Sequence, residues 1–367
     1  MKNHSPSSRV GLSAALLVIG VVSALHAQNI ITFDVPNSIS TQPAAINSAG
    51  QVTGSYWDAN GSHGFLRQAD GKFTRFDVPN NFSGLVVTGV TSMNAAGEIV
   101  GYILTLDTDS YHSFLRQTDG TFILLNAPGP CQAPMATKAD LSSWAVPLLS
   151  IDGVVFTGIN NRGQITGVYG EVLCHRSFLR QPDGTIISFG VAPDAVPGPN
   201  TIAQAINLRG QTTGYYLDNH TFRGFLREPD GTITTFAAAD SDTYPTAIAP
   251  RGEITGYAGG HGFLRQRNGS IVTFDAPNSL ATQPTAINQK GQIAGFCLDA
   301  NYVYHGFLRE QNGSFMTVDV PNSTNTYPAA MNAKGQMTGW YSDASGGVHG
   351  FVSVASSQTC TSCGLLN

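Results

Sequence analysis

Short runs of alternating apolar and polar residues dominate this chain, and glycine-containing turns separate them. One set of four runs comprises residues 43–46, 51–56, 63–67 and 73–78. Alternation with a period of two over such short runs is typical of half-buried β-strands joined by hairpin turns. The pattern therefore predicts an all-β protein built from short antiparallel strands.

The same four-strand pattern recurs along the chain. Its third strand carries a Phe-Leu-Arg triplet, which begins at Phe65, Phe114, Phe178, Phe225, Phe263 and Phe307, with a degenerate copy at Phe351. An Asn-x-x-Gly block precedes each triplet and begins at Asn47, Asn94, Asn160, Asn207, Asn288 and Asn332, with Ala249 in the fifth copy. Four strands in a repeat of about 45 residues are typical of one blade of a β-propeller.

The seventh copy lacks its fourth strand, because nothing after Phe351 matches the aromatic-Asp-Val-Pro segment that ends the other copies. A spare copy of that segment lies at the other end of the chain, over residues 31–36. We therefore predict a seven-bladed β-propeller over residues 28–355, closed by pairing of the N-terminal strand with the C-terminal blade. An open β-solenoid or two stacked sandwiches are the alternatives, but a solenoid would not place its missing strand at the opposite terminus.

The connections between strands are of two kinds. The turns after the first and third strands have fixed lengths, and each turn after a third strand contains Asp-Gly or Asn-Gly, for example Asp70-Gly71. Such a pair predicts a type I′ hairpin turn. The other two connections vary in length, and antiparallel order puts them on the opposite face. We call these the turn face and the variable face, and we expect ligands on the variable face because variable loops on a rigid scaffold commonly bind them.

The repeat resembles the bacterial extracellular HAF-type repeat family, which is named for a His-x-Phe signature. That signature is present at His63, His112, His261, His305 and His349, whereas Arg176 and Arg223 stand at the equivalent places in the third and fourth copies. The resemblance covers residues 30 to 353 and implies an exported protein, but it brings no activity and no catalytic residue. A residue that recurs once per blade is expected to be structural. The repeated His and the Arg of Phe-Leu-Arg are therefore predicted to bond or pack against neighbouring turns.

The first 27 residues have the features of an export signal, with Lys2 and Arg9 before an apolar segment and small residues at two possible cleavage positions. The apolar segment is shorter than the ~20 residues that a spanning helix needs. We therefore expect a secreted, periplasmic or cell-surface protein with no membrane span after cleavage. A net charge of −5 without a basic run argues against a nucleic-acid partner.

An exported protein can form disulfides, and four of the five cysteines are placed to do so. Cys131 lies in a long insertion between the second and third copies, and Cys174 lies in a loop on the same face, so we predict that they pair. Cys360 and Cys363 are predicted to pair within a C-terminal tail, residues 356–367. The fifth, Cys297, replaces a strand tyrosine and is expected to be a buried free thiol.

The irregular third and fourth copies are the place where a specific site is expected. Arg176 and Arg223, with Lys138 and Trp144 of the insertion, are the candidate ligand-binding residues, because guanidinium groups bind carboxylates well. Glu171, His175 and His220 are the candidate proton-transfer groups if the protein is an enzyme.

Two functions remain open from the sequence. The first is a non-catalytic binding or scaffold module, expected to be monomeric, for glycans, envelope components or proteins. The alternative is a propeller-type polysaccharide lyase or glycoside hydrolase with its site on the variable face near the third and fourth blades. No metal site and no cofactor are predicted, since five histidines spread around a ring do not converge on one ion.

Overall fold

The computed structural model describes residues 29–79, 86–125, 152–171, 174–191 and 200–354. Every regular element in these ranges is a β-strand, as predicted. No helix in the described part of the chain is long and apolar enough to cross a membrane. The predicted signal segment, the insertion with Cys131, Lys138 and Trp144, and the C-terminal tail lie outside the described residues.

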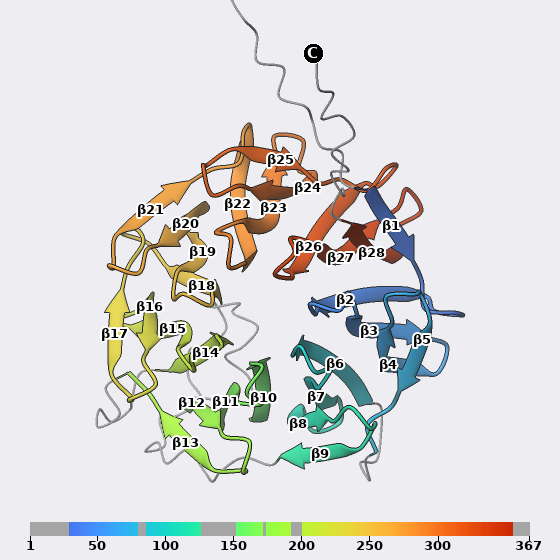
Figure 1. The fold of residues 1–367 in the computed structure, drawn as a ribbon, viewed down its shortest axis with the longest axis horizontal. Coiled ribbons are helices and arrows are strands. Elements are labelled where there is room, and N and C mark those ends of the chain that lie inside the picture. The colour runs from blue at the N-terminus through green and yellow to red at the C-terminus, as the bar shows by residue number, and fades with distance from the viewer. Residues whose placement is uncertain (1–28, 80–85, 126–151, 172–173, 192–199, 355–367) are drawn as a thin grey trace, which may run out of the picture.

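The strands are arranged as a ring around a central axis (Figure 1). The strands nearest the axis are β2 (Ser40–Ile46), β6 (Val86–Met93), β10 (Asp152–Ile159), β14 (Thr201–Ile206), β18 (Thr243–Ile248), β22 (Ser279–Ile287) and β26 (Asn325–Met331). The second strands are β3 (Val52–Asp58), β7 (Ile99–Thr105), β11 (Ile165–Glu171), β15 (Thr212–Asp218), β19 (Ile254–Ala258), β23 (Ile293–Asp299) and β27 (Met337–Ser342).

Two further sets of strands complete the ring toward its outside. The third strands are β4 (Gly61–Arg67), β8 (Ser110–Arg116), β12 (Cys174–Arg180), β16 (Thr221–Arg227), β20 (His261–Arg265), β24 (Tyr304–Arg309) and β28 (Val348–Val354). The outermost strands are β5 (Phe73–Phe76), β9 (Phe122–Leu125), β13 (Ile186–Phe189), β17 (Ile233–Phe236), β21 (Ile271–Phe274), β25 (Phe315–Thr317) and β1 (Asn29–Phe33).

Hydrogen bonding groups these strands into five sheets. Three sheets have four strands each, namely β14–β17, β18–β21 and β22–β25. The other two have eight strands, and in each a short parallel pairing joins two runs of four: Ser40 with Val348 in one, and residues 152–153 with 110–111 in the other. We use the word unit for one run of four strands. Sheets set around a common axis form the arrangement of a β-propeller.

The two ends of the described chain are joined, as the sequence predicts. β1 pairs antiparallel with β28, from Asn29 opposite Val354 to Phe33 opposite Gly350. A second link lies near the axis, where the Asn332 side chain donates a hydrogen bond to the Asn47 carbonyl at 2.9 Å. The first and last units are therefore connected at both the outer strand and the inner strand.

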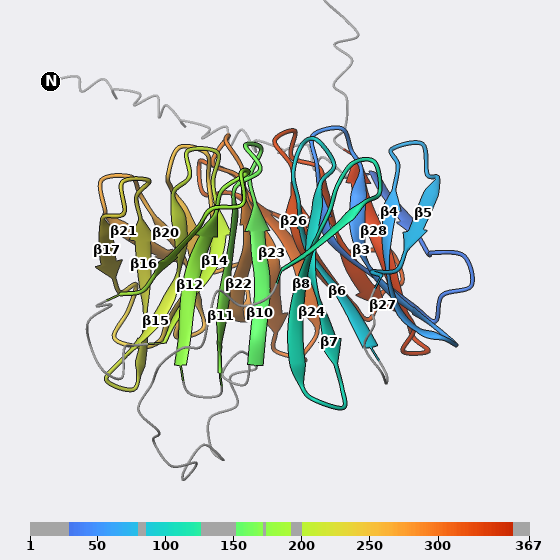
Figure 2. The same ribbon diagram turned by 90° about the horizontal axis from the view of Figure 1, so that it is seen from below.

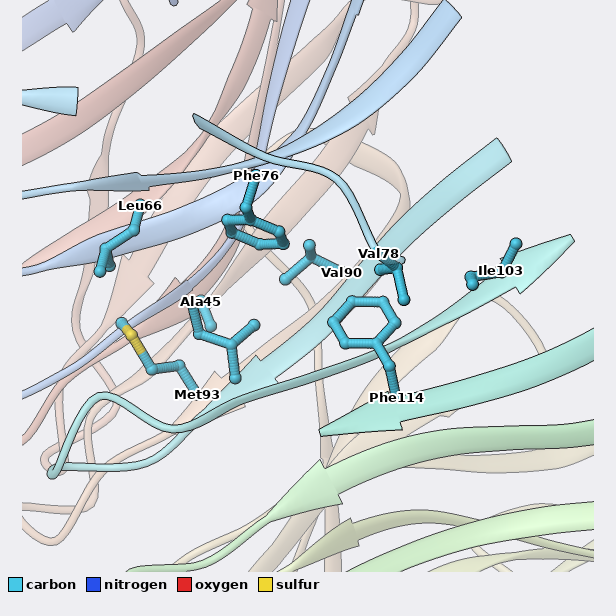
Figure 3. Close-up of a cluster of buried hydrophobic side chains, with 9 residues drawn as sticks. Ala45, Leu66, Phe76, Val78, Val90, Met93, Ile103 and Phe114 are labelled. Carbon is cyan, nitrogen blue, oxygen red and sulfur yellow. The ribbon is translucent and has the colours of Figure 1, made fainter. Parts of the chain in front are cut away.

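The core lies between neighbouring units. The Phe of each Phe-Leu-Arg triplet is fully buried or nearly so, and Figure 3 shows one such cluster, in which Phe76 and Val78 of one unit pack with Val90 and Phe114 of the next. Burying a side chain of this size contributes roughly 1.5–3 kcal/mol. The repeated phenylalanines thus hold adjacent sheets together.

The repeated Arg also joins neighbouring units, and its structural role agrees with the sequence interpretation. The Arg67 guanidinium lies 4.9 Å from the ring centre of Phe33, and its Nη1 donates to the carbonyl of Gln68 in the following turn. The same stacking recurs in four other places, at Arg116, Arg227, Arg265 and Arg309. Cation–π contact of this kind stabilises desolvated sites by about 1–2 kcal/mol.

The predicted type I′ geometry of the fixed turns is wrong. In the turn after β4, Gly71 has a φ of 93°, but Asp70 is not among the residues with positive φ. Gly71 N–H donates to the Gln68 carbonyl, and Gln68 N–H donates to the Lys72 carbonyl. This is the three-residue loop with a glycine bulge, which needs positive φ only at the glycine.

The fourth strands end earlier than the sequence pattern predicts. β5 stops at Phe76 and β1 stops at Phe33, so the Asp and Val that follow leave the ladder. Val35 N–H donates instead to the hydroxyl of buried Thr41, at 3.1 Å. The segment after each aromatic residue is therefore held by side chains, and its Asp becomes available for other contacts.

The two faces of the ring differ as expected. In Figure 2 the short turn between β10 and β11 lies at the upper edge, and the connection between β7 and β8 lies at the lower edge. The upper edge is the turn face and the lower edge is the variable face.

Candidate functional site

A histidine held by aspartates recurs on the variable face. The Nδ1 atom of His63 bonds Asp77, and its Nε2 lies 3.1 Å from Asp58. His305 and His349 repeat this arrangement with two aspartates each, and His261 repeats it with one. One Asp comes from the loop between the second and third strands, and the other follows the outer strand. The repeated His therefore joins two connections of its own unit.

These contacts favour the protonated imidazole. Burial of the ring acts to lower the pKa of His63, but the hydrogen bonds and negative charges of Asp77 and Asp58 outweigh it and raise that pKa above its ordinary value. The pKa values of His305 and His349 are raised for the same reasons. A histidine whose two ring nitrogens both face carboxylates is poorly placed for proton transfer to a ligand. This geometry agrees with a structural role.

The loop acids also serve their own turns. Asp58 accepts a hydrogen bond from Asn60 N–H at 2.7 Å, and Asp343 accepts from the N–H groups of Ser345 and Gly347. The Ser345 hydroxyl and the backbone donors lower the pKa of Asp343 to about 2. No group of three or more metal-ligating side chains gathers around one point within the described ranges.

The units that carry Arg in place of His also lack the Asp that follows the outer strand. Arg176 is opposite Tyr169 and Arg223 is opposite Tyr216, as His63 is opposite Tyr56. The residue after the outer strand, Asp77 in the first unit, is Gly190 or Ala237 in these two units. The repeated His and the outer Asp are therefore both absent from these two units.

The candidate proton-transfer groups are placed differently from one another. His175 is only 2 % exposed, and its backbone N–H donates to the Asn200 side chain at 3.0 Å. His220 is exposed in the turn between β15 and β16, with a φ of 70°. Neighbouring residues of a strand point to opposite faces, so His175 and Arg176 do not face the same side of β12.

Cys131, Lys138, Trp144, Cys360 and Cys363 lie outside the described residues, and the side chains of Glu171 and Cys174 are likewise not described. The Cys131–Cys174 and Cys360–Cys363 disulfides therefore remain predictions. Cys297 is a buried free thiol, as predicted.

Exposed apolar side chains on the variable face were not singled out from the sequence. Ile39 is 70 % exposed, Trp57 37 %, Leu280 59 % and Tyr302 76 %. Each lies in, or next to, a connection of variable length. In such connections the alternation of apolar and polar residues does not predict which side chains are buried. The signal available in the sequence was an apolar residue at a loop position, such as Ile39 directly after Pro36-Asn37-Ser38.

Comparison with known proteins gives the fold and nothing more specific. No protein-family model and no curated protein matches the chain. A structure of virginiamycin B lyase from Staphylococcus aureus matches 89 % of this chain and 99 % of that one, with a TM-score of 0.57 and 14 % sequence identity. A streptogramin B lyase structure matches 89 % of this chain and 98 % of its own, with a TM-score of 0.54 and 13 % identity. The chain has the β-propeller fold. At this identity no catalytic residue of these lyases is transferred to the propeller described above.

Proposed function

We propose that this protein is an exported, monomeric, non-catalytic binding module, and that it is a closed propeller of seven blades with its ligand on the variable face. Support for the blade count comes from the strands, which fall into seven consecutive groups of four when β1 is counted with β26–β28. Support for closure comes from the β1–β28 pairing and the Asn332–Asn47 hydrogen bond. The ligand class is a glycan, an envelope component or another protein.

The observation that carries the binding role is the exposure of large apolar side chains on the variable face. Among the described residues, this face has five of them: Ile39, Trp57, Leu106, Leu280 and Tyr302. The turn face has Leu208. Aromatic side chains with one apolar surface and a polar edge are well suited to sugar rings and to protein partners.

The polar groups of the same face are mostly committed to the scaffold. Histidines that a catalytic site could use are bonded to aspartates on one or both ring nitrogens in four units. What remains accessible is a contact surface, which favours binding over acid–base chemistry.

A glycan array and a pull-down from envelope extract, both with the mature protein, test this role. The variant Trp57→Ala combined with Tyr302→Asn removes two aromatic contacts, and asparagine tolerates the φ of 63° at position 302. Binding is expected to weaken at least about tenfold, which corresponds to ~1.4 kcal/mol. Leu208→Ala on the turn face is the matched control and should bind as the wild type does. Equal binding by all three proteins would contradict the proposed surface.

A second candidate is an enzyme that acts on an acidic polysaccharide, a lyase or a glycoside hydrolase. It is suggested by the exchange at positions 176 and 223, where Arg stands in place of the repeated His and where Gly190 or Ala237 stands in place of the outer Asp. Guanidinium groups recognise carboxylates such as those of uronic acids. Glu171 and His220 are then the candidate proton-transfer groups, whereas His175 is too deeply buried to reach a polymer without a local opening.

Depolymerisation assays on uronic-acid polymers distinguish the two candidates. Activity in the wild type that is lost in Arg176→Ala/Arg223→Ala, with an unchanged circular dichroism spectrum, would establish the enzyme. Binding without any change in polymer length would leave the binding module as the better account.

A further inference from the structure

A cavity of about 410 Å³ lies between the connection that follows β21 and the strands β23–β25. Its polar wall contains Asp299, His305 and Asp319, and its apolar wall contains Cys297, Phe307 and Phe315. Cavities that bind small molecules have volumes of roughly 300–1,000 Å³. The size is therefore sufficient for one small ligand.

Cys297 lines the cavity at a position where four other units have a tyrosine and the remaining two have Ile103 and Ala258. Cys297 is directly opposite His305, as Tyr56 is opposite His63 and Tyr341 is opposite His349. The Tyr56 ring stacks on the His63 ring with their centres 5.0 Å apart, and Tyr341 lies 5.1 Å from His349. A thiol cannot fill the volume of a phenol ring, so the space beside His305 stays open. Cys297 itself is a free thiol with only 9 % of its surface exposed.

The polar wall is rigid and presents hydrogen-bond acceptors. Asp319 binds His305 Nδ1 at 2.7 Å and accepts from Gly306 N–H at 3.1 Å, while Asp299 lies 3.5 Å from His305 Nε2. Asp299 also accepts hydrogen bonds from the N–H groups of Asn301 and Val303 and from the Asn301 side chain, which fills its acceptor positions, whereas Asp319 keeps some of its acceptor positions available. Two carboxylates beside one imidazolium also repel anions. The polar wall is thus suited to a hydroxyl donor, and the apolar wall that contains Phe307 and Phe315 is suited to an apolar face.

We propose that this cavity binds a neutral, hydroxyl-rich ligand of the size of a single sugar ring, with a hydroxyl on Asp319 and its apolar face toward Phe315. This narrows the proposed binding role to one pocket and depends on that role only for the class of ligand. The site binds and does not react: burial and the two aspartates raise the pKa of the Cys297 thiol to about 11, so the thiol stays neutral. Both ring nitrogens of His305 face aspartates and are not directed at the sulfur.

The thiol offers a direct readout of occupancy. The full mature protein is treated with N-ethylmaleimide in the presence of glucose, galactose, mannose, fucose or N-acetylglucosamine, and labelling of Cys297 is followed by peptide mass spectrometry. At ten times the dissociation constant, a bound sugar should slow labelling of Cys297 about elevenfold. Glucuronate, which is anionic, should give little protection. If no neutral sugar slows labelling at millimolar concentrations, or if glucuronate protects best, the proposal is overturned.

Two variants locate the binding. Cys297→Tyr introduces the residue that four other units have at this position and should fill the cavity, so sugar binding measured by saturation-transfer NMR should be lost. Cys297→Ser keeps the cavity and should retain binding. Sugar binding by folded Cys297→Tyr at the wild-type level would overturn the proposal. If that variant does not fold, the labelling experiment on the wild-type protein tests the proposal by itself. A negative result for this cavity can be told apart from a negative result for the proposed binding function, because that function is tested with the separate variant Trp57→Ala/Tyr302→Asn.

Discussion

The unit that contains His63 and the unit that contains Arg223 share a scaffold but differ in one side-chain contact on the variable face. In the first, His63 is held between Asp58 and Asp77. In the second, Arg223 has Ala237 where the outer aspartate would be. The comparison teaches that the His–Asp pair is a removable part of the fold, since the strand pairing around it is unchanged.

The largest expected loss of stability comes from the buried phenylalanine that the two units have in common. Phe65→Ala and Phe225→Ala each remove a phenylalanine with 0 % exposure, so each should lower the free energy of unfolding by about 3–5 kcal/mol. Urea denaturation measures both. Similar losses would show that the scaffold is equally packed in the two units, whereas a loss below about 1 kcal/mol in one unit would contradict the shared core.

A smaller loss of stability should distinguish the His63 unit from the Arg223 unit. His63→Ala leaves Asp58 and Asp77 without their partner, so we expect a loss of about 1–2 kcal/mol. Arg223→Ala should cost less than about 0.5 kcal/mol, because Ala237 provides no carboxylate. The same urea measurement serves both variants, and an equal loss would mean that Arg223 is also bound to the scaffold.

The stability of the protein should also depend on pH through His63 and not through Arg223. The pKa of His63 is raised in the folded state, so its contribution is fully present below the unfolded pKa of 6.5 and is lost as the pH rises through the folded value. The thermal midpoint should therefore fall less between pH 6 and 9 in His63→Gln than in the wild type. Identical slopes in the two proteins would be evidence against the coupling; Arg223→Gln is the control and should keep the wild-type slope.

The smallest effect tests the paired exchange itself. Ala237→Asp places a carboxylate where the other units have one, and a partly exposed pair with Arg223 should stabilise by no more than about 1 kcal/mol. If Arg223 binds an anionic ligand, the same variant should weaken that binding. Anion binding that stays unchanged in Ala237→Asp would separate Arg223 from the ligand site.

Some of this network was available in the sequence. His63 and Asp77 are 14 residues apart, and so are His261 and Asp275, and His305 and Asp319. A fixed interval of this kind links the His-x-Phe signature to the Asp of the closing segment. The type of turn was not available in the same way, because Asp-Gly is compatible with two hairpin loops, which the φ of Asp70 and the hydrogen bonds between Gln68 and Lys72 distinguish.

The sequence alone determined the repeat, its four strands and the partner of the N-terminal strand, because alternation and fixed intervals are local properties of the chain. The tertiary structure decided what lies between units. It shows that Arg67 of the first unit stacks on Phe33, whose strand β1 completes the last unit, and that a cavity lies beside Cys297 and His305. Such features depend on which side chains from distant segments fill a shared volume, and the order of residues within one repeat does not contain that information.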